Sequence, residues 1–384
     1  MSDTTKDKKT LIECFTAVED PRNKDTILHK LIDIIVIGVL SILCGGESFN
    51  DMETFGRAKE KWLRKFLELP FGIPSHDTFN AVFSRLNPNE FNECFMEWVN
   101  TLYERVSREI ISIDGKTARR TKCKAKNLKA AHIVSAWAKK NKLALGQIKV
   151  DDKSNEITAI PELLKLLDIK GCIITIDAMG TQTKIAEQIV EGGADYVLAL
   201  KENQETLHDE VKLYFEEEIL TKKKKELQEN GQYYKSLAKD HGRIEKREYY
   251  MTKDVSWITQ INRWANLQAI GMEISERQIN EEKSISTKFY IMSDIKSVNE
   301  FADAARGHWS VENSLHWCLD VGLREDESRA RSDNAAINLN MARKIAINLL
   351  KKETTLKVGI KGKRLNCALD ENYLEKVLKL GFQQ

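Results

Sequence analysis

The sequence lacks the features of disordered, membrane-spanning and secreted proteins. Only five prolines occur among 384 residues and apolar residues make up 42% of the chain, which excludes a disordered polypeptide. The longest apolar run, residues 34–44, is too short and too interrupted to span a bilayer. The first residues are polar and of mixed charge, with no apolar signal segment behind them. We therefore expect a folded cytoplasmic protein without a membrane partner.

Metal-binding and disulfide patterns of cysteine are also missing. The seven cysteines are odd in number and lack the short spacings of a zinc site. Scattered cysteines of this kind fit reduced thiols better than a disulfide framework. They are Cys14, Cys44, Cys94, Cys123, Cys172, Cys318 and Cys367.

Acidic residues are absent from one long stretch of the chain. The net charge is only +2, but residues 115–150 contain eleven lysines and arginines and no Asp or Glu. Charge of one sign suggests a polyanionic partner, and the alternative is a soluble lysine-rich surface. A second, weaker basic cluster lies at residues 351–364. The eleven residues are Lys116, Arg119, Arg120, Lys122, Lys124, Lys126, Lys129, Lys139, Lys140, Lys142 and Lys149.

Two apolar segments end in the same way. Residues 110–113 are β-branched or small and are followed by Asp114, and residues 172–176 are followed by Asp177. This pattern is typical of buried strands that each deliver one carboxylate to the edge of a sheet. A single aspartate at such a position is more simply explained as a cap of the next turn. A matched pair favours a shared site.

The predicted elements give an α/β protein with a mixed sheet flanked by helices. Residues 131–138 and 143–150 are predicted to form a hairpin, and further strands and helices follow up to residue 204. The predicted organisation is a disordered start at 1–9, a helical N-terminal domain at 10–105, a core at 106–204 and 298–350, a β-rich insertion at 205–297 and a basic tail at 351–384.

The N-terminal domain allows two interpretations. A proline-glycine turn at residues 70–74 separates two short predicted helices. They form either a helix-turn-helix DNA reader, with residues 76–86 in a groove, or an ordinary helical bundle.

A third carboxylate is predicted at Glu312. His308, Glu312 and His316 are spaced four apart, so a helix would place them in one stripe beside the apolar stripe of Val311 and Leu315. The alternative for Glu312 is a surface salt bridge. Three carboxylates are the ligands that two hard cations would need for phosphoryl transfer, and oxygen ligands select Mg²⁺ or Mn²⁺ over Zn²⁺. The rival acids are Asp151, Asp152, Asp320, Glu325 and Asp326.

Several longer motifs resemble a known family. The segments Ile-Asp-Gly-Lys at 113–116 and Thr-Ile-Asp-Ala-Met-Gly at 175–180 are followed by Tyr-Val-Leu-Ala-Leu-Lys-Glu-Asn-Gln at 196–204. Together with the His-Trp and Glu-Asn pairs at 308–313 and the Glu-Asp pair at 325–326, they resemble bacterial insertion-sequence DDE transposases of the H-repeat-associated type. The resemblance covers almost the whole chain.

The resemblance implies a ribonuclease-H-like core and a catalytic triad of Asp114, Asp177 and Glu312 that binds two Mg²⁺ ions, with Mn²⁺ as a substitute. It implies phosphodiester hydrolysis and strand transfer on double-stranded DNA, at terminal inverted repeats and in target DNA, by a homodimer in the bacterial nucleoid. The wider group often has a Tyr and an Arg before this glutamate and a Lys seven residues after it. This chain has Ala305 and His308 before Glu312 and Leu319 after it. The candidate DNA contacts are Lys116, Arg119, Arg120, Arg306 and His308.

Two other functions remain compatible with these residues. One is a DNA-binding relic of a transposase that no longer catalyses, and the other is a metal-dependent nuclease that cuts without joining. Binding of end DNA without a metal-dependent product would favour the relic. A strand-transfer assay would separate the nuclease from the transposase.

Overall fold

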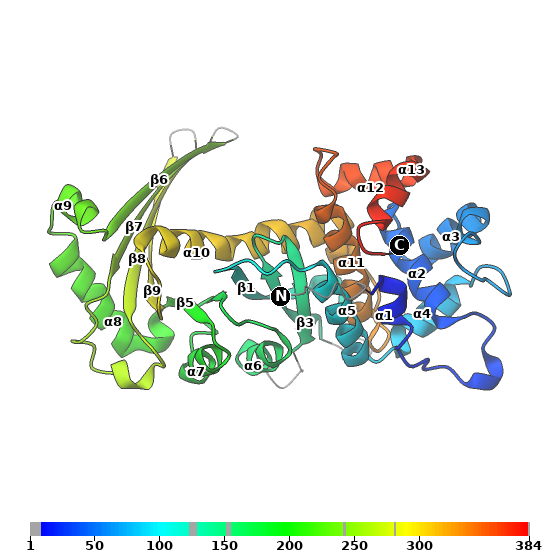
Figure 1. Cartoon of the computed structure of the whole chain (residues 1–384), viewed down its shortest axis with the longest axis horizontal. Coiled ribbons are helices and arrows are strands. Elements are labelled where there is room, and N and C mark those ends of the chain that lie inside the picture. The colour runs from blue at the N-terminus through cyan, green and yellow to red at the C-terminus, as the bar shows by residue number, and fades with distance from the viewer. Residues whose placement is uncertain (1–8, 123–128, 151–154, 241–242, 280–281, 383–384) are drawn as a thin grey trace, which may run out of the picture. The chain divides into compact units, whose positions relative to one another are not determined.

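The computed structural model describes residues 9–122, 129–150, 155–240, 243–279 and 282–382 of the chain (Figure 1). Asp151, Asp152, Lys124 and Lys126, and the predicted disordered start up to residue 8, lie outside these residues. The chain divides into two compact units. Unit 1 comprises Met1–Glu104, Gly115–Lys153 and Glu312–Gln384, and unit 2 comprises Arg105–Asp114 and Ser154–Val311. Within the described ranges, no helix is both long and apolar enough to cross a membrane.

Unit 1 is built around one buried helix, α11 (Ala335–Lys352). It packs against helices from the N-terminal segment and against a β-hairpin. The N-terminal helices are α1 (Leu11–Phe15), α2 (Leu31–Leu43), α3 (Phe49–Leu63), α4 (His76–Arg85) and α5 (Pro88–Leu102). The helical N-terminal segment therefore shares a core with residues far along the chain, because its apolar faces need α11 to bury them.

The N-terminal helices begin where their sequence provides caps. Ser48 accepts a hydrogen bond from the backbone of Asp51 in a reciprocal capping box, and Ser75 caps α4 through Thr78. Helix α4 contacts α2, α3 and α11 and buries Phe79, Val82 and Phe83. The segment 76–86 is thus one member of a helical bundle, and its sides are occupied by other helices.

The predicted basic C-terminal tail contains two helices. Helices α12 (Ile360–Leu369) and α13 (Glu371–Leu378) follow α11 and contact it. The buried guanidinium of Arg364 donates to the carbonyl oxygens of Ile42, Gly46 and Gly322 at 2.6–3.0 Å. Carbonyls near a helix end lack intrahelical partners, so Arg364 satisfies groups that would otherwise be buried without a donor.

The hairpin of unit 1 makes buried polar contacts with α11. Strands β2 (Ala131–Ala138) and β3 (Leu143–Lys149) pair antiparallel, as predicted. The ammonium of Lys344 on α11 donates to Ser135 Oγ and Gln147 Oε1, each at 2.6 Å, and Asn348 bonds to both backbone groups of Ala144. These bonds fix α11 on the hairpin. Strand β1 (Ile110–Ala118), longer than the predicted 110–113, lies next to β2.

Lys344 makes the stability of the protein depend on pH. Burial lowers the pKa of Lys344 from 10.5 to about 7. Between these values the unfolded chain binds a proton that the folded chain does not, so the free energy of unfolding rises with pH, by at most about 1.4 kcal/mol per pH unit. Urea unfolding at pH 7, 8 and 9 should show a shallower rise for Lys344→Met than for the parent. The exposed Lys222→Met is the control and should show the slope of the parent. An equal slope of unfolding free energy against pH for Lys344→Met and the parent would contradict this assignment.

Unit 2 contains a mixed sheet with the strand order β1-β4-β5-β9-β8-β7-β6. Strands β1, β4 and β5 are parallel, and β5 through β6 pair antiparallel in that order. Beyond β1, the strands are β4 (Ile173–Ile176), β5 (Asp195–Leu200), β6 (Tyr233–Asp240), β7 (Arg243–Thr252), β8 (Ala269–Ile279) and β9 (Glu282–Met292).

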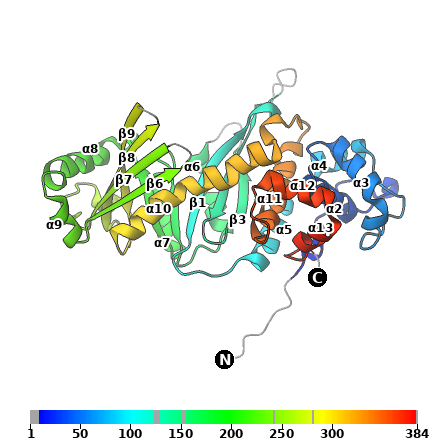
Figure 2. The same cartoon turned by 90° about the horizontal axis from the view of Figure 1, so that it is seen from above.

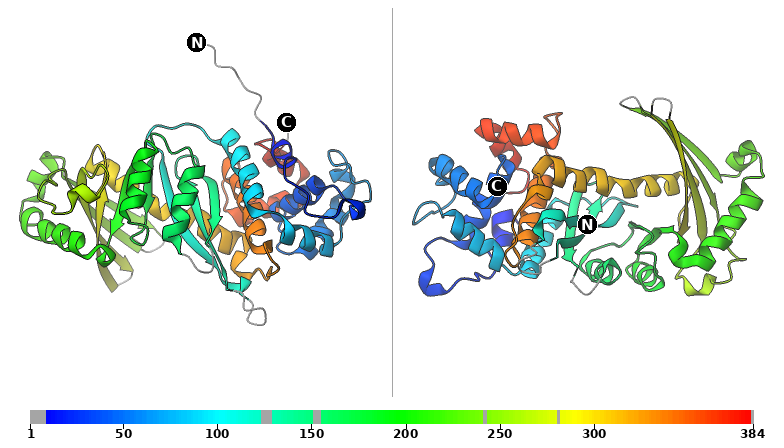
Figure 3. Two further views of the ribbon diagram at one scale, coloured as in Figure 1. Left: turned by 90° about the horizontal axis from the view of Figure 1, so that it is seen from below. Right: turned by 180° about the vertical axis from the view of Figure 1, so that it is seen from behind.

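Helices cover both faces of this sheet. Helix α10 (Val298–Val311) runs across β4, β5, β6 and β7 (Figure 2). Helices α6 (Glu156–Leu166) and α7 (Thr183–Glu191) lie on the opposite face (Figure 3). Phe301 of α10 packs on the rings of Tyr249 and Tyr290, with distances between ring centroids of 5.8 and 5.2 Å. The predicted fold class, an α/β protein with a large mixed sheet flanked by helices, is therefore confirmed.

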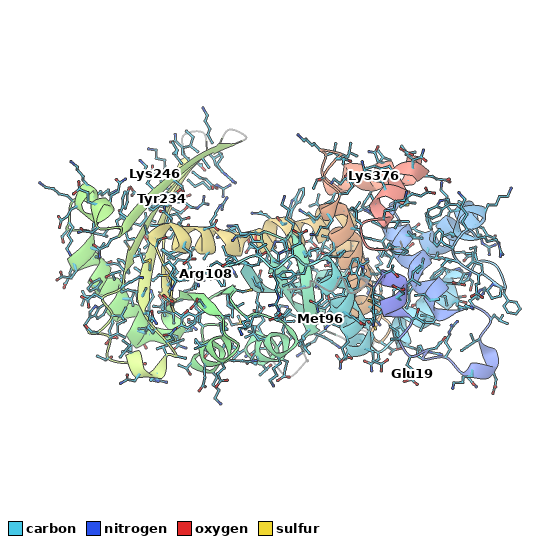
Figure 4. All side chains as sticks on the ribbon, in the orientation of Figure 1. Glu19, Met96, Arg108, Tyr234, Lys246 and Lys376 are labelled. Carbon is cyan, nitrogen blue, oxygen red and sulfur yellow. The ribbon has the colours of Figure 1, made fainter. Side chains whose placement is uncertain are left out.

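Charged contacts join the distant segments of unit 2. Arg108, which is labelled in Figure 4, lies two residues before β1. Its guanidinium pairs with Glu300 at the start of α10 at 2.7 Å and also with Asp195 at the start of β5. The segment 205–297 holds β6 to β9 together with α8 (Glu205–Tyr214) and α9 (Lys224–Glu229). On its strands, Lys246 lies opposite Glu276 in register, with 3.7 Å between the charged groups.

Candidate active site

Asp114 and Asp177 each follow a paired position of two neighbouring strands. Strands β1 and β4 pair in parallel from Ile110 with Ile173 to Ile113 with Ile176, and the two aspartates are the next residues. Neighbouring strands are roughly 4.8 Å apart, which is within the reach of one shared ligand. Both side chains are half-buried. Asp177 directly follows β4, whereas β1 continues past Asp114 to Ala118, so the prediction that Asp114 stands at a strand end is wrong.

Asp177 is held by the turn that follows it. Its Oδ1 accepts the N–H of Gly180 at 3.2 Å, so the residue does cap a turn, as the simpler interpretation expected. A Cβ at Gly180 would come within 2.3 Å of Ile176 and 2.8 Å of Ile160, so only glycine permits this close turn. Burial raises the pKa of Asp177 and the charge of Glu156 raises it further, while Gly180 and Lys201 oppose the rise. Negative charge at this position is therefore incompletely compensated by the protein.

A polar ladder fixes α10 over the same face of the sheet. Ser112 Oγ donates to the carbonyl oxygen of Gly307 at 3.2 Å, and Thr175 Oγ1 lies 3.2 Å from Nδ1 of His308. Ser112 and Thr175 are bonded to each other at 3.0 Å. Side chains two residues apart in a strand share a face, so Ser112 marks the face of Asp114. The hydroxyls of Ser112 and Thr175, inside two otherwise apolar segments, are the sequence signal for this ladder.

His308 is enclosed in this ladder as a neutral imidazole. Burial lowers the pKa of His308 to about 4, and the charge of Lys288 acts in the same direction. Near neutral pH the ring is therefore uncharged. Its candidate role as a DNA contact then depends on hydrogen bonding and not on charge.

Glu312 directly follows α10, on a helix of altered geometry. It is the first residue of a π-helical segment, η7 (Glu312–His316), and a second, η8 (Cys318–Gly322), comes soon after. A π-helix has more residues per turn than an α-helix, so the predicted stripe of His308, Glu312 and His316 is not kept. Glu312 is exposed and His316 is buried, whereas Val311, Leu315 and Leu319 are buried as predicted. π-Helical segments frequently occur at functional sites.

Glu312 belongs to unit 1, while Asp114 and Asp177 belong to unit 2. In the part of the chain that the structure describes, no three His, Cys, Asp or Glu side chains already stand close enough to hold a metal ion. Two of the three predicted carboxylates thus follow paired strand positions, and the third begins the helical turn after His308.

Lys116 and the rival acids form one buried network. The ammonium of Lys116 lies 2.7 Å from Asp320 Oδ1, 2.8 Å from Glu325 Oε2 and 3.7 Å from Asp326 Oδ1. Burial opposes its charge, but Glu325 and Asp320 raise the pKa of Lys116 above its ordinary value. Glu325 also accepts a hydrogen bond from Asn340 at 2.5 Å. Because this lysine is committed to carboxylates, it is not among the DNA contacts that we propose below.

The other candidate basic residues are accessible. Arg119 has an 82% exposed side chain and lies 3.6 Å from Asp326, and Arg120 is also exposed. Arg306 is 43% exposed and lies 3.8 Å from Glu245. Arg119 and Arg120 belong to unit 1 and Arg306 to unit 2.

The chain is similar to known transposases over nearly its whole length. Residues 12–99 match the family described as DDE_Tnp_1-associated, and residues 106–349 match the family described as Transposase DDE domain. The putative transposase YncI of Escherichia coli O157:H7 is 39% identical over 383 residues, which cover 98% of this chain and 97% of that protein. The H repeat-associated putative transposase YhhI of Escherichia coli K12 is 38% identical over 375 residues, covering 96% and 98%.

Similarity to solved structures is weaker. The piggyBac transposase, in a synaptic complex with hairpin DNA, aligns with a TM-score of 0.41 and 11% identity over 93% of this chain and 76% of that one. The sequence matches are far stronger and confirm the resemblance noted from the motifs. The chain belongs to the transposase DDE domain family, and its relatives include H repeat-associated putative transposases.

Proposed function

We propose that the protein is a metal-dependent DNA transposase that hydrolyses phosphodiesters at the ends of an insertion sequence and then joins the freed strand to target DNA. Asp114, Asp177 and Glu312 are its catalytic carboxylates. The observation that carries the proposal is the parallel register of β1 and β4, in which Asp114 and Asp177 directly follow the paired residues Ile113 and Ile176. The position of Glu312 immediately after α10, whose His308 contacts Thr175, supports the third assignment.

The donor set fits hard divalent cations. Carboxylate oxygens suit Mg²⁺, with Mn²⁺ as a substitute, and the raised pKa of Asp177 identifies a position where a cation would relieve uncompensated charge. A bound pair of such ions would supply charge stabilisation to the attacking and leaving oxygens of phosphoryl transfer. The chain itself contributes the oxygens of Asp114, Asp177 and Glu312, and the N–H of Gly180 orients Asp177.

The same site would lie on a ribonuclease-H-like core. In unit 1, β2 and β3 pair antiparallel, and in unit 2, β1, β4 and β5 pair in parallel. This mixture, with helices α6 and α7 between the parallel strands, supports the proposed core.

Cleavage and joining of element-end DNA test the function. The purified chain is incubated with duplexes carrying the inverted repeats that flank its gene and with Mg²⁺. We expect nicked ends and, with added target DNA, joined products, and chelation by EDTA should abolish both. Cleavage without joining would instead identify a nuclease. Binding of these ends with no metal-dependent product would identify a catalytically silent relic.

Double-stranded DNA is the proposed partner, contacted in part by Arg119 and Arg120. Each phosphate contact releases counterions, so its loss lowers the slope of log Kd against log salt by about 0.9. The double variant Arg119→Ala, Arg120→Ala should therefore lower the slope by about 1.8 in fluorescence anisotropy titrations. The matched control is Lys222→Ala, Lys223→Ala, which removes equal charge from unit 2. An unchanged slope would exclude these two arginines from the interface. A homodimer acting on two DNA ends is part of the proposal.

A further inference from the structure

One pocket within unit 1 is not used by the proposed chemistry. It has a volume of about 340 Å³ and is lined by three segments that are distant in sequence. These are the start of α3, the N-terminal end of α4 and the loop between Glu327 and α11. The residues that matter here are Ser48, Phe49, His76, Asn80, Arg329 and Arg331. Binding pockets of roughly 300 Å³ are at the small end of their range, so this one matches a nucleotide-sized group and not a duplex.

The lining of this pocket is rich in hydrogen-bond donors and positive charge. Arg329 and Arg331 are both exposed and flank Ala330. Arg331 is held in place because its Nε donates to the backbone oxygen of Arg120 at 2.9 Å. That bond uses one of the five N–H donors of a guanidinium, and the planar group suits bidentate contact with phosphate.

Helix α4 adds two further donors on one face. His76 and Asn80 are four residues apart, so they lie on the same side of the helix. The hydrogen bond from Ser84 Oγ at 3.2 Å goes to Asn80 Oδ1, which leaves the amide nitrogen of Asn80 as a donor. Glu53 bonds to His76 Nδ1 at 2.8 Å and raises the pKa of the imidazole. His76 is thereby more easily charged near neutral pH.

The lining holds one acidic residue, Glu47, which lies 3.3 Å from Arg324, and Arg324 also pairs with Glu327. The two arginines of the lining outnumber this single carboxylate. Arg331 also lines a second, smaller cavity, where Lys129, Lys149 and Arg331 outnumber Asp333. The exposed Arg120 lies at the same place through its bond with Arg331. Phosphate groups spaced along a DNA strand match this series of basic residues better than an isolated ion does.

We propose that this pocket binds a backbone phosphate and sugar of DNA, as a second DNA contact in unit 1 apart from the catalytic carboxylates. The proposal rests on the proposed function for the identity of the ligand. Helix α4 contributes to this contact with the face of His76 and Asn80, which lines the pocket, while α2, α3 and α11 pack against its other faces. Contacts to phosphate position DNA without reading its sequence.

Two single variants test the pocket without disturbing the core. Arg329→Ala removes one charge from an exposed side chain, and Asn80→Asp places a carboxylate against the phosphate. The matched control is Arg263→Ala, an exposed arginine of unit 2. Binding is measured by fluorescence anisotropy with an end-DNA duplex over a series of salt concentrations, and thermal melting confirms folding. We expect Arg329→Ala to lower the salt slope by about 0.9, Asn80→Asp to weaken binding at least tenfold and the control to change neither.

The possible results separate the pocket from the function. If the parent binds end DNA but both variants bind with unchanged affinity and slope, the pocket proposal is overturned and the transposase proposal stands. If the parent binds no DNA, both are overturned. Inorganic phosphate serves as a competitor: release of DNA only at high concentrations supports a backbone contact. If low concentrations saturate the pocket, as judged by thermal stabilisation that Arg329→Ala abolishes, without weakening DNA binding, the site is for a small anion and the proposal fails.

Discussion

Asp177→Asn is expected to reduce metal-dependent cleavage of end DNA about a thousandfold or more, which corresponds to at least about 4 kcal/mol of transition-state stabilisation. The substitution keeps the oxygen that accepts the N–H of Gly180 and removes the charge that would hold a cation. The turn therefore survives while the ligand is lost. Asp114→Asn should have a similar effect, because its carboxylate occupies the neighbouring strand position.

The stability of Asp177→Asn distinguishes this account from simple unfolding. Burial raises the pKa of Asp177, so the folded chain binds a proton more tightly than the unfolded chain, and the ionised carboxylate destabilises the fold above its folded pKa. The variant should melt at the same temperature as the parent or higher near neutral pH. Asp168→Asn, an exposed position paired with Arg105, is the matched control and should cleave normally. Cleavage by Asp177→Asn at the parental rate would remove Asp177 from the active site.

Glu325→Gln is expected to destabilise the protein by about 3–5 kcal/mol, the typical result of removing one partner from a buried ion pair. The side chain of Glu325 is 2% exposed and lies 2.8 Å from Lys116 and 3.7 Å from Arg343, which are 11% and 3% exposed. Glutamine has the same shape but no charge, so both cations would stay buried with less compensation. Urea unfolding at neutral pH measures the loss.

The loss of stability in Glu325→Gln should depend on pH. Burial alone would raise the pKa of Glu325, but Lys116 and Arg343 hold it below the ordinary value of 4.5. The carboxylate therefore stabilises the fold above about pH 4.5, and that contribution is lost as the pH falls through its folded pKa. The difference between parent and variant should narrow in acid. Glu327→Gln, an exposed neighbour paired with Arg324, should leave stability nearly unchanged because solvent screens an exposed ion pair. An equally small effect of Glu325→Gln would mean that the network is not structural.

Local pattern was sufficient for much of the fold. The β-branched runs before Asp114 and Asp177, the hairpin at 131–149 and the buried positions Val311 and Leu315 were readable because side-chain spacing reports which face of an element is apolar. The contacts of the basic cluster near the C-terminus were not readable in this way. Sequence shows that Arg364 is charged, and only the packed structure shows the carbonyls that it satisfies.

The candidate site was predictable in part. The sequence predicted three candidate carboxylates, but it treated residues 308–316 as one regular helix, whereas the chain widens into a π-helix at Glu312. It also offered Lys116 as a DNA contact on charge alone. The acids that enclose this lysine lie more than 200 positions away in the chain, and sequence spacing carries no information about such distant partners.

The sequence by itself determined which segments are strands and helices, which residues can bind cations and which family the chain resembles, because these depend on local periodicity and on side-chain chemistry. Tertiary structure alone decided that Asp114 and Asp177 follow paired strand positions, that Lys116 is neutralised by Glu325 and that Arg329 and Arg331 share a pocket with α4. Strand register and the burial of charge are set by contacts between segments far apart in the chain, and those contacts exist only once the chain has folded.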